Sequence, residues 1–269
     1  MILEFIIMTS IRDKIHVNIP FTMLFESYLD LFIQYRLNPE IGFDAMALDS
    51  YSHSDVEFVA DQLHKNGLSV TVHAPFMDLS SGSPDPMIRD VCRKRFDQML
   101  QFAFLVKPKS IVFHSGFDEK RYWHIKDDWI EKSLDIWLDL IASAANKNVL
   151  LMLENVFEHS PHDIRNFLEK IRSDKIGFCL DTGHQQVFSS ISLEGWVDTL
   201  GPCIGQLHLH DNNGEKDEHL AMGKGIINFR MLFEKLRSLK QEPPIITLEP
   251  HKEEDLWPSL DYLERIWPW

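Results

Sequence analysis

The sequence predicts an α/β protein that folds as a single (β/α)₈ barrel, in which eight strands alternate with eight helices. Short apolar runs rich in β-branched residues alternate with runs of helical period along the whole chain. No stretch of the 269 residues has the composition of a linker between domains. Six of the apolar runs end on a histidine or an acid, and the C-terminal ends of barrel strands share one mouth. An open, doubly wound sheet is the alternative, but this chain lacks the glycine-rich first turn of that fold.

Eight short runs are predicted as strands because they are apolar and are bounded by polar or turn-forming residues. In order, they are 14–20, 39–44, 68–73, 110–114, 149–154, 176–181, 204–210 and 244–249. The run 39–44 is the least regular of them. The segments predicted as helices have apolar residues that recur every three or four positions. They are 21–37, 52–64, 86–106, 127–146, 162–171, 196–200, 231–239 and 259–267.

The connecting segments add to this outline. Ser52 or Ser54 can cap the helix 52–64, and Gly67 suits the left-handed turn that ends it. The loop 74–86 is long, and the turn-rich stretch 210–225 is predicted as a polar rim rather than a helix. We divide the chain into an N-terminal extension, residues 1–13, and a barrel domain, residues 14–269.

The composition limits the compartments and partners that we expect. The formal net charge is −14, with 41 acids against 27 bases, which argues against a protein that coats nucleic acid. Three cysteines without CxxC spacing indicate a reducing, cytoplasmic setting. The apolar N-terminal run is too short to cross a membrane, so no membrane partner is predicted. Three tryptophans near the C-terminus are expected in the core or on a homodimer patch: Trp257, Trp267 and Trp269.

Predicted strands five to eight carry three acids and a histidine at or near their C-terminal ends. These residues are Glu154, Asp181, His208 and Glu249. Carboxylate and imidazole donors together suit divalent ions such as Mn²⁺, Zn²⁺, Mg²⁺ or Co²⁺. Burying a lone carboxylate after an apolar run costs on the order of several kcal/mol unless it is paired or binds a metal. The sequence therefore predicts a divalent metal centre at the barrel mouth.

Five further residues are candidate metal or substrate ligands near the same mouth. They are His73 and His114 at the ends of strands three and four, His184, and Asp217 and His219 in the rim. A single histidine at a strand end is more often hydrogen-bonded in the core, and Asp181 could instead cap the following helix. Cys179 is predicted as a core residue one layer below Asp181.

The other histidines are not expected to join this centre. His210 is expected to face away from His208, towards the helices or the rim. The remaining ones are expected on surfaces or in loops, with no assigned role: His16, His53, His64, His124, His159, His162 and His251.

Seven motifs at these strand ends resemble those of the xylose isomerase-like barrel superfamily. They are HAPF, HSG, LEN, LDTGH, LHLHDN, DEHLAMGKG and LEPH, and the resemblance runs from Lys14 over nearly the whole chain. This superfamily holds sugar isomerases and epimerases beside the endonuclease IV type of apurinic/apyrimidinic endonuclease. The epimerase resemblance implies that Glu154, Asp181, His208 and Glu249 hold one divalent ion. It also implies that Glu154 and Glu249 are an acid/base pair that moves a proton next to a carbonyl, through an enediolate.

The endonuclease resemblance implies instead that nine residues hold three zinc ions. All nine positions are filled here, by His73, His114, Glu154, Asp181, His184, His208, Asp217, His219 and Glu249. A basic rim for DNA is not evident, because the stretches 74–86 and 185–196 contain no lysine or arginine. We therefore predict a sugar or sugar-phosphate isomerase or epimerase, with an endonuclease IV-like zinc phosphodiesterase on abasic DNA as the alternative. A third possibility is another small-molecule activity, such as dehydration or lyase chemistry.

Two residues outside the ligand set are candidates for substrate binding. Phe76 could form an apolar wall for a sugar ring or stack on a base. Lys224, within GKG, could contact a substrate phosphate or be a solvated lysine on a turn.

Overall fold

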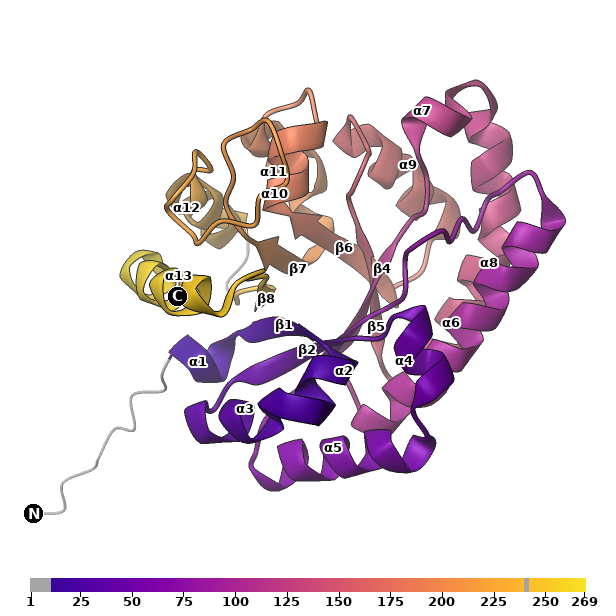
Figure 1. Cartoon of the computed structure of the whole chain (residues 1–269). Helices are drawn as coiled ribbons and strands as arrows, with labels where there is room; N and C mark the ends of the chain where they lie inside the picture. The colour runs from indigo at the N-terminus through magenta and orange to yellow at the C-terminus, as the bar shows by residue number, and fades with distance from the viewer. Residues whose placement is uncertain (1–10, 240–241) are drawn as a thin grey trace, which may run out of the picture.

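The eight strands of the computed structural model form one closed parallel barrel in the order of the sequence (Figure 1). The structure describes residues 11–239 and 242–269. The strands are β1 (His16–Pro20), β2 (Asn38–Gly42), β3 (Thr71–His73), β4 (Ser110–His114), β5 (Leu150–Glu154), β6 (Ile176–Asp181), β7 (Ile204–Leu209) and β8 (Ile245–Leu248). The predicted single (β/α)₈ barrel is confirmed, and each of the eight strands lies within or next to its predicted range.

Helices connect the strands on the outside of the barrel (Figure 1). They are α1 (Ile11–Lys14), α2 (Phe21–Met23), α3 (Leu29–Tyr35), α4 (Ala45–Ser50), α5 (His53–Lys65), α6 (Pro86–Val106), α7 (Glu119–Tyr122), α8 (Lys126–Lys147), α9 (Pro161–Ile171), α10 (Thr182–Phe188), α11 (Leu193–Leu200), α12 (Phe229–Leu239) and α13 (Glu253–Ile266). The single helix predicted over 21–37 is divided, because a π-helical turn at Leu24–Tyr28 separates α2 from α3. The short helices α4, α7 and α10 were not predicted, because each is too short to show helical periodicity.

Alternate strand residues point outward and pack on the helices. Phe113 of β4 lies edge-on to Phe96 of α6 and to Trp137 of α8, with ring centroids 5.1 and 5.6 Å apart. Phe178 of β6 stacks on Trp196 of α11 at 5.9 Å. This layer of buried apolar side chains is the main core, and it leaves the inward positions of the strands free for polar residues.

The inside of the barrel is polar below the mouth. Glu40 of β2, Gln206 of β7 and Thr247 of β8 are fully buried and hydrogen-bonded to one another. Cys179 is buried with Val112 and Met152 in a small apolar cluster, as the prediction of a core cysteine requires. His16 is also buried, so its expected surface position is wrong. It lies on β1, where alternation points its side chain inward.

Both described ends of the chain pack on the barrel. Residues 1–10 of the predicted extension lie outside the described residues, while Ile11 of α1 is buried in the main core. The guanidinium of Arg12 lies over the ring of Trp257, 5.2 Å from its centroid. The three C-terminal tryptophans were predicted in the core or on a homodimer patch. All three are partly buried against the core: Trp257, Trp267 and Trp269. No helix among the described residues is long and apolar enough to cross a membrane.

Candidate active site

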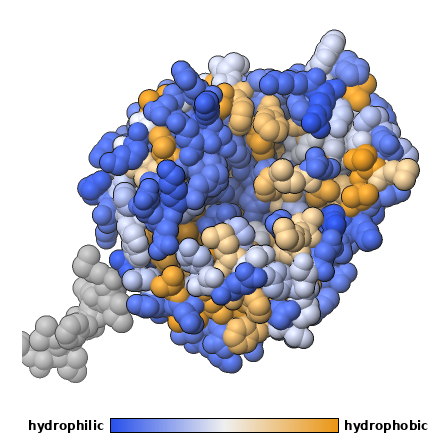
Figure 2. Space-filling model, in the orientation of Figure 1, coloured by the Kyte–Doolittle hydropathy of each residue, from blue (hydrophilic) through white to orange (hydrophobic). Residues whose placement is uncertain are grey.

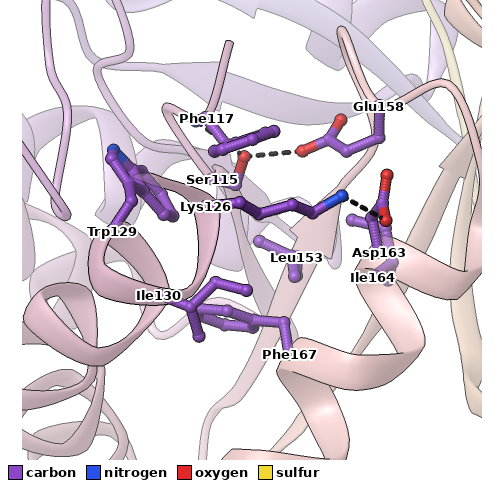
Figure 3. A pocket seen from close by; sticks show the side chains of 10 residues that line it. All are labelled: Ser115, Phe117, Lys126, Trp129, Ile130, Leu153, Glu158, Asp163, Ile164 and Phe167. Atoms are coloured by element: carbon purple, nitrogen blue, oxygen red, sulfur yellow. Dashed lines mark hydrogen bonds and ion pairs between the residues drawn. The ribbon is translucent and has the colours of Figure 1, made fainter. Parts of the chain in front are cut away.

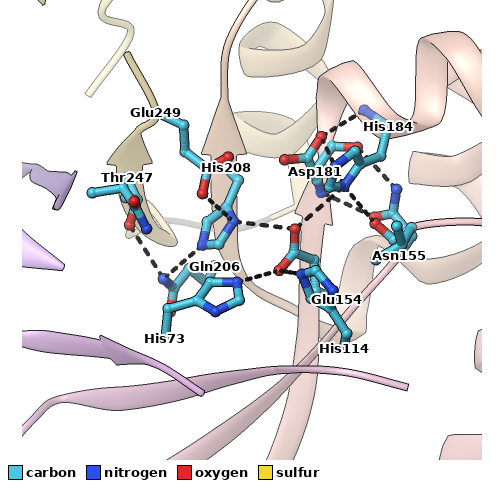
Figure 4. A network of polar contacts seen from close by, with 12 residues as sticks. His73, His114, Glu154, Asn155, Asp181, His184, Gln206, His208, Thr247 and Glu249 are labelled. Carbon is cyan, nitrogen blue, oxygen red and sulfur yellow. Dashed lines mark hydrogen bonds and ion pairs between the residues drawn. The ribbon is translucent and has the colours of Figure 1, made fainter. Parts of the chain in front are cut away.

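The four residues of the predicted metal centre converge at the C-terminal ends of the last four strands (Figure 4). We call Glu154, Asp181, His208 and Glu249 the inner set. Glu154 and Asp181 end β5 and β6, His208 is the penultimate residue of β7, and Glu249 directly follows β8. The Nδ1 atom of His208 lies 3.0 Å from an oxygen of Glu249 and 3.3 Å from an oxygen of Glu154.

Glu154 lies at the centre of the cluster. Its Oε2 atom is 3.1 Å from Nε2 of His73 and 3.2 Å from Nε2 of His114, and its Oε1 atom faces His184 and His208. Burial alone would raise the pKa of this carboxyl, but the charges of His208 and His114 hold it well below its usual value. Glu154 is therefore an ionised carboxylate whose two oxygens both face imidazole nitrogens.

Asp181 caps the following helix, as one interpretation of its position predicted, and its carboxylate also faces the site. Its Oδ1 atom accepts a hydrogen bond of 2.6 Å from the backbone N–H of His184 and so caps α10. The same carboxylate faces Nε2 of His210 at 3.1 Å. Burial would raise its pKa, but the charges of His184 and His210 lower the value to about 2.

His210 belongs to the site, contrary to the expectation that it would face away. Residues two apart on a strand point to the same side of the sheet. Since His210 follows His208 by two positions, its side chain points inward as well. Its side chain is buried at 2% exposure, with Nε2 on Asp181 and Nδ1 3.7 Å from an oxygen of Asp217. We call His184, His210, Asp217 and His219 the outer cluster.

The outer cluster joins α10 to the loop between β7 and α12. The Nε2 atoms of His184 and His219 both lie 3.3 Å from Oδ2 of Asp217. His219 has a left-handed backbone with φ of +49°. The ring of His251, a histidine expected without a role, stacks on that of His219 at 3.5 Å.

Backbone carbonyls fix the orientation of three of these histidines. The Nδ1 atoms of His73, His184 and His219 donate to the carbonyl oxygens of Ala74, Asn155 and Glu249, at 2.9, 3.0 and 3.1 Å. An Nδ1–H bond to a carbonyl leaves the Nε2 lone pair for a metal. In each case that Nε2 atom faces a carboxylate oxygen.

Glu40 is a functional candidate that sequence reasoning missed. Its Oε1 atom lies 3.0 Å from Nε2 of His208, while its Oε2 atom accepts from Thr71, Gln206 and Thr247. Burial would raise its pKa, but His208 lowers the value to about 2. The available signal was an acid inside an apolar strand run, at a position where alternation points it into the barrel.

The donors fit a divalent cation. Glu40 and the acids of the inner set and the outer cluster form ion pairs with histidines. Among the described residues, none of these carboxylates pairs with a lysine or an arginine. Three buried atoms of the inner set and the outer cluster also lack a hydrogen-bond partner among the described residues: Nδ1 of His208, Nδ1 of His210 and Oδ1 of Asp217. Each leaves a lone pair directed at the cluster, as a metal ligand would.

The two predicted substrate contacts differ in position. Phe76 lies on the loop after β3 and stacks on His114 with ring centroids 4.4 Å apart, yet 45% of it is exposed. It therefore forms an apolar edge of the polar site. The face of the molecule drawn in Figure 2 is largely hydrophilic, with hydrophobic patches between the polar regions. Lys224 is exposed on the turn before α12, and no ion pair of its ammonium group occurs within the described ranges.

A small cavity beside the mouth is separate from this site (Figure 3). Its volume is about 20 Å³, enough for about one water molecule. Glu158 is buried in its wall, accepts from the hydroxyl of Ser115 at 2.6 Å, and has a pKa that burial raises. Lys126, which also lines the cavity, pairs with Asp163. The cavity is too small for a sugar.

Comparisons with known proteins agree with this fold. The family model described as "Xylose isomerase-like TIM barrel" matches residues 37–266. An uncharacterized protein of Methanocaldococcus jannaschii is 32% identical over 204 residues, which cover 74% of this chain and 78% of that protein. A probable endonuclease 4 of Mycoplasma mobile is 26% identical over 181 residues, covering 61% of this chain and 62% of its own.

Solved structures resemble the whole barrel. The crystal structure of a D-tagatose 3-epimerase-like protein superposes with a TM-score of 0.78 at 21% identity, covering 94% of this chain and 97% of that one. At this level of identity the likeness concerns the fold.

Proposed function

Because the chain belongs to the xylose isomerase-like TIM barrel family, we propose that it is a divalent-metal-dependent isomerase or epimerase of a sugar or sugar phosphate. The reaction would move a proton on the carbon next to a carbonyl group, through an enediolate. One observation carries the proposal. Carboxylate oxygens of Glu154 and Glu249, which come from strands three places apart, both lie within 3.3 Å of Nδ1 of His208.

The inner set would hold the metal, through Glu154, Asp181, His208 and Glu249. A divalent ion there would polarise a carbonyl and its neighbouring hydroxyl and so acidify the intervening C–H group. Manganese, zinc, magnesium and cobalt all accept this mixture of carboxylate and imidazole. His73 and His114 would contact the substrate or a further ion, because both face the second oxygen of Glu154.

The two glutamates would act on opposite sides of the substrate. Glu154 ends β5 and Glu249 follows β8, so β6 and β7 separate them around the barrel. An ionised Glu154 can accept the proton as the C–H bond breaks and its electron pair enters the enediolate. Glu249 as a carboxylic acid can then return a proton to the other face, which inverts the carbon. In an isomerisation, one carboxylate would instead move the proton between neighbouring carbons.

The surroundings fit a small polar substrate with one apolar face. Phe76 is exposed beside His114 and can pack against the C–H groups of a sugar ring. Lys224 is our candidate for a contact to a substrate phosphate, since it lies on the rim turn before α12. With three free cysteines, we also propose a cytoplasmic location.

An endonuclease IV-like zinc phosphodiesterase is the second candidate. It is favoured by Glu154, because each of its oxygens faces two histidine nitrogens, as a carboxylate that bridges two metal ions would. The similarity to a probable endonuclease 4 also supports it. The absence of lysine and arginine from 74–86 and 185–196 favours the sugar enzyme, because abasic DNA would need a basic rim.

Hydrogen exchange into the substrate tests the proposal. The protein is loaded with Mn²⁺ or Zn²⁺ and incubated in D₂O with a panel of free and phosphorylated ketoses. We expect deuterium on the carbon next to the carbonyl of at least one sugar, detected by NMR. The zinc-loaded protein is also incubated with a duplex that contains an abasic site. Nicking of that duplex without exchange into any ketose would replace our proposal with the second candidate.

Variants of the two glutamates test the proton-transfer pair. Glu154→Gln and Glu249→Gln should each reduce turnover at least about 100-fold, because each removes a general acid/base. Glu254→Gln, an exposed acid on α13, is the matched control and should turn over normally. Near-full activity of either site variant would contradict the two-glutamate mechanism.

A further inference from the structure

We propose that His210 is a metal ligand that completes a second, closed cation site in the outer cluster. Its four donors would be His184, His210, Asp217 and His219. The inference goes beyond the proposed function, which uses only the inner set, and beyond the nine ligands of the endonuclease resemblance, which leave His210 out. One ligand atom from each of the four residues lies within 4.8 Å of every other.

The state of His210 supports this assignment. Its side chain is buried at 2% exposure, and its Nε2 atom lies 3.1 and 3.2 Å from the two oxygens of Asp181. An ionised carboxylate can only accept, so the ring proton lies on Nε2 and the lone pair on Nδ1. That Nδ1 atom has no hydrogen-bond partner and lies 3.7 Å from Oδ1 of Asp217, which also lacks one. A cation between them would satisfy both buried atoms.

The other two histidines present their lone pairs to the same point. The Nδ1 atoms of His184 and His219 donate to backbone carbonyls, which leaves Nε2 free in each ring. Both Nε2 atoms lie 3.3 Å from Oδ2 of Asp217. Three imidazole lone pairs and one carboxylate therefore converge in the outer cluster.

The ring of His210 is held in place by its neighbours. It stacks on His219 with centroids 3.6 Å apart and planes within 4°. On another side it lies against Gly183, where an added Cβ would come within 1.9 Å of the ring. The glycine of the DTGH motif thus leaves the space that this imidazole fills, so the ring cannot turn Nδ1 away without disturbing its neighbours.

The number of donors predicts the behaviour of the outer ion. Three imidazoles and one carboxylate can complete a tetrahedral set that leaves no position for water or substrate, as in structural zinc sites. In the inner set, by contrast, we propose that the carbonyl and hydroxyl oxygens of the substrate join the four protein donors. An ion bound in the outer cluster would connect the loop between β7 and α12 to α10. His210 would also link it to the inner set, because its Nε2–H donates to Asp181.

Metal content tests the proposal without reference to sugar turnover. Zinc-loaded protein is passed through a chelator of moderate affinity, and the ions that remain per chain are counted by mass spectrometry. His210→Gln is the main variant, because the glutamine Nε2 can still donate to Asp181 while the Nδ1 ligand is gone. We expect it to retain one ion per chain fewer than the wild type. Asp217→Asn, at the partly exposed rim, should lose the same ion, and the double variant should lose no more.

Cobalt gives an independent measurement. Co²⁺ in a closed tetrahedral site absorbs strongly in the visible range, so we expect this band in the wild type and its loss in His210→Gln. His251→Gln is the matched control, since it removes a stacked ring but no proposed ligand, and it should keep both the ion and the band.

The outcomes separate this proposal from its alternatives. If His210→Gln keeps the wild-type ion count and cobalt spectrum, His210 is no ligand. If His210→Gln loses an ion that Asp217→Asn retains, His210 acts on the inner set through Asp181, and the proposal is equally wrong. Neither result bears on hydrogen exchange with ketoses, so failure here and failure of the proposed function remain distinguishable.

Discussion

The Nε2 atom of His208 lies 3.0 Å from Oε1 of Glu40, a fully buried carboxylate on the opposite part of the barrel. Since a carboxylate can only accept, Glu40 holds a proton on Nε2, so Nδ1, which faces Glu154 and Glu249, is the nitrogen that a metal ion in the inner set would bind. Glu40 therefore acts on the candidate metal centre through His208 without being a ligand of the inner set. Such carboxylate–histidine pairs set both the orientation and the basicity of a metal ligand.

Removing the Glu40 charge should weaken metal binding. We expect Glu40→Gln to reduce zinc affinity by about 10-fold to 100-fold, the usual effect of losing such a supporting carboxylate. Competition with a fluorescent chelator measures this. Glu26→Gln, an exposed acid that accepts from Tyr51, is the control and should bind zinc normally. Equal affinities of Glu40→Gln and wild type would show that His208 needs no such support.

His16 should make a contribution to the stability of the metal-free protein that is lost in mild acid. Burial and the charge of Lys109 lower the pKa of His16 from 6.5 to about 4. The unfolded chain therefore binds a proton that the folded one does not, so stability is lost as the pH falls from about 6.5 towards about 4. Between pH 7.5 and pH 5 this amounts to about 2 kcal/mol in the free energy of unfolding.

Urea unfolding of two variants isolates this contribution. His16→Gln removes the titrating group and can keep the contact to the hydroxyl of Ser69. Its free energy of unfolding should fall by about 2 kcal/mol less than that of the wild type over the same pH interval. His124→Gln, an exposed histidine in the 3₁₀ turn before α8, should behave like the wild type. Identical pH profiles for His16→Gln and wild type would contradict the prediction.

The loop that carries Asp217 and His219 depends on Asp211. This buried carboxylate accepts from four backbone N–H groups, those of Asn212, Gly223, Gly225 and Ile227, at 2.9 to 3.1 Å. In Asp211→Asn one oxygen becomes an NH₂ group that cannot accept. We expect the free energy of unfolding to fall by about 2–4 kcal/mol, since buried donors lose their acceptor.

The control for Asp211 lies in the same loop. Glu218 is exposed and accepts from the backbone and side chain of Asn213. Glu218→Gln should change the free energy of unfolding by less than about 1 kcal/mol, as expected for an exposed contact. Comparable losses in the two variants, measured by denaturant unfolding, would mean that Asp211 does not organise the loop.

Phe76 should contribute to substrate affinity rather than to the proton transfer. We expect Phe76→Ala to raise KM several-fold with a small change in kcat, because the ring contacts substrate in ground and transition states alike. Phe76→Trp should restore a low KM. Phe58→Ala, at a ring that is 52% exposed on α5, is the control. A large fall in kcat for Phe76→Ala would instead place the ring in the chemistry.

The sequence predicted the fold and the inner set because both depend on local signals. An apolar run that ends in Glu154 or Asp181 identifies a strand and its last residue without knowledge of the partners. Glu40 was missed because its partners come from β1, β3, β7 and β8, which surround it only when the barrel closes. His210 lies just beyond the end of β7, where its inward direction was wrongly assigned. The π-helical turn after α2 has no periodicity signal of its own.

The position of Glu40 has a consequence for how the barrel could be divided. A fragment that carries β5 to β8 contains every residue of the inner set, yet it lacks the acceptor for Nε2 of His208. In such a half-barrel the imidazole could adopt either tautomer and either orientation. Two separately expressed halves should thus regain tight metal binding only on association, although the N-terminal half contributes no ligand to the inner set. Recovery of metal binding when the two halves associate would therefore depend on the Nε2 proton of His208, which Glu40 holds in place.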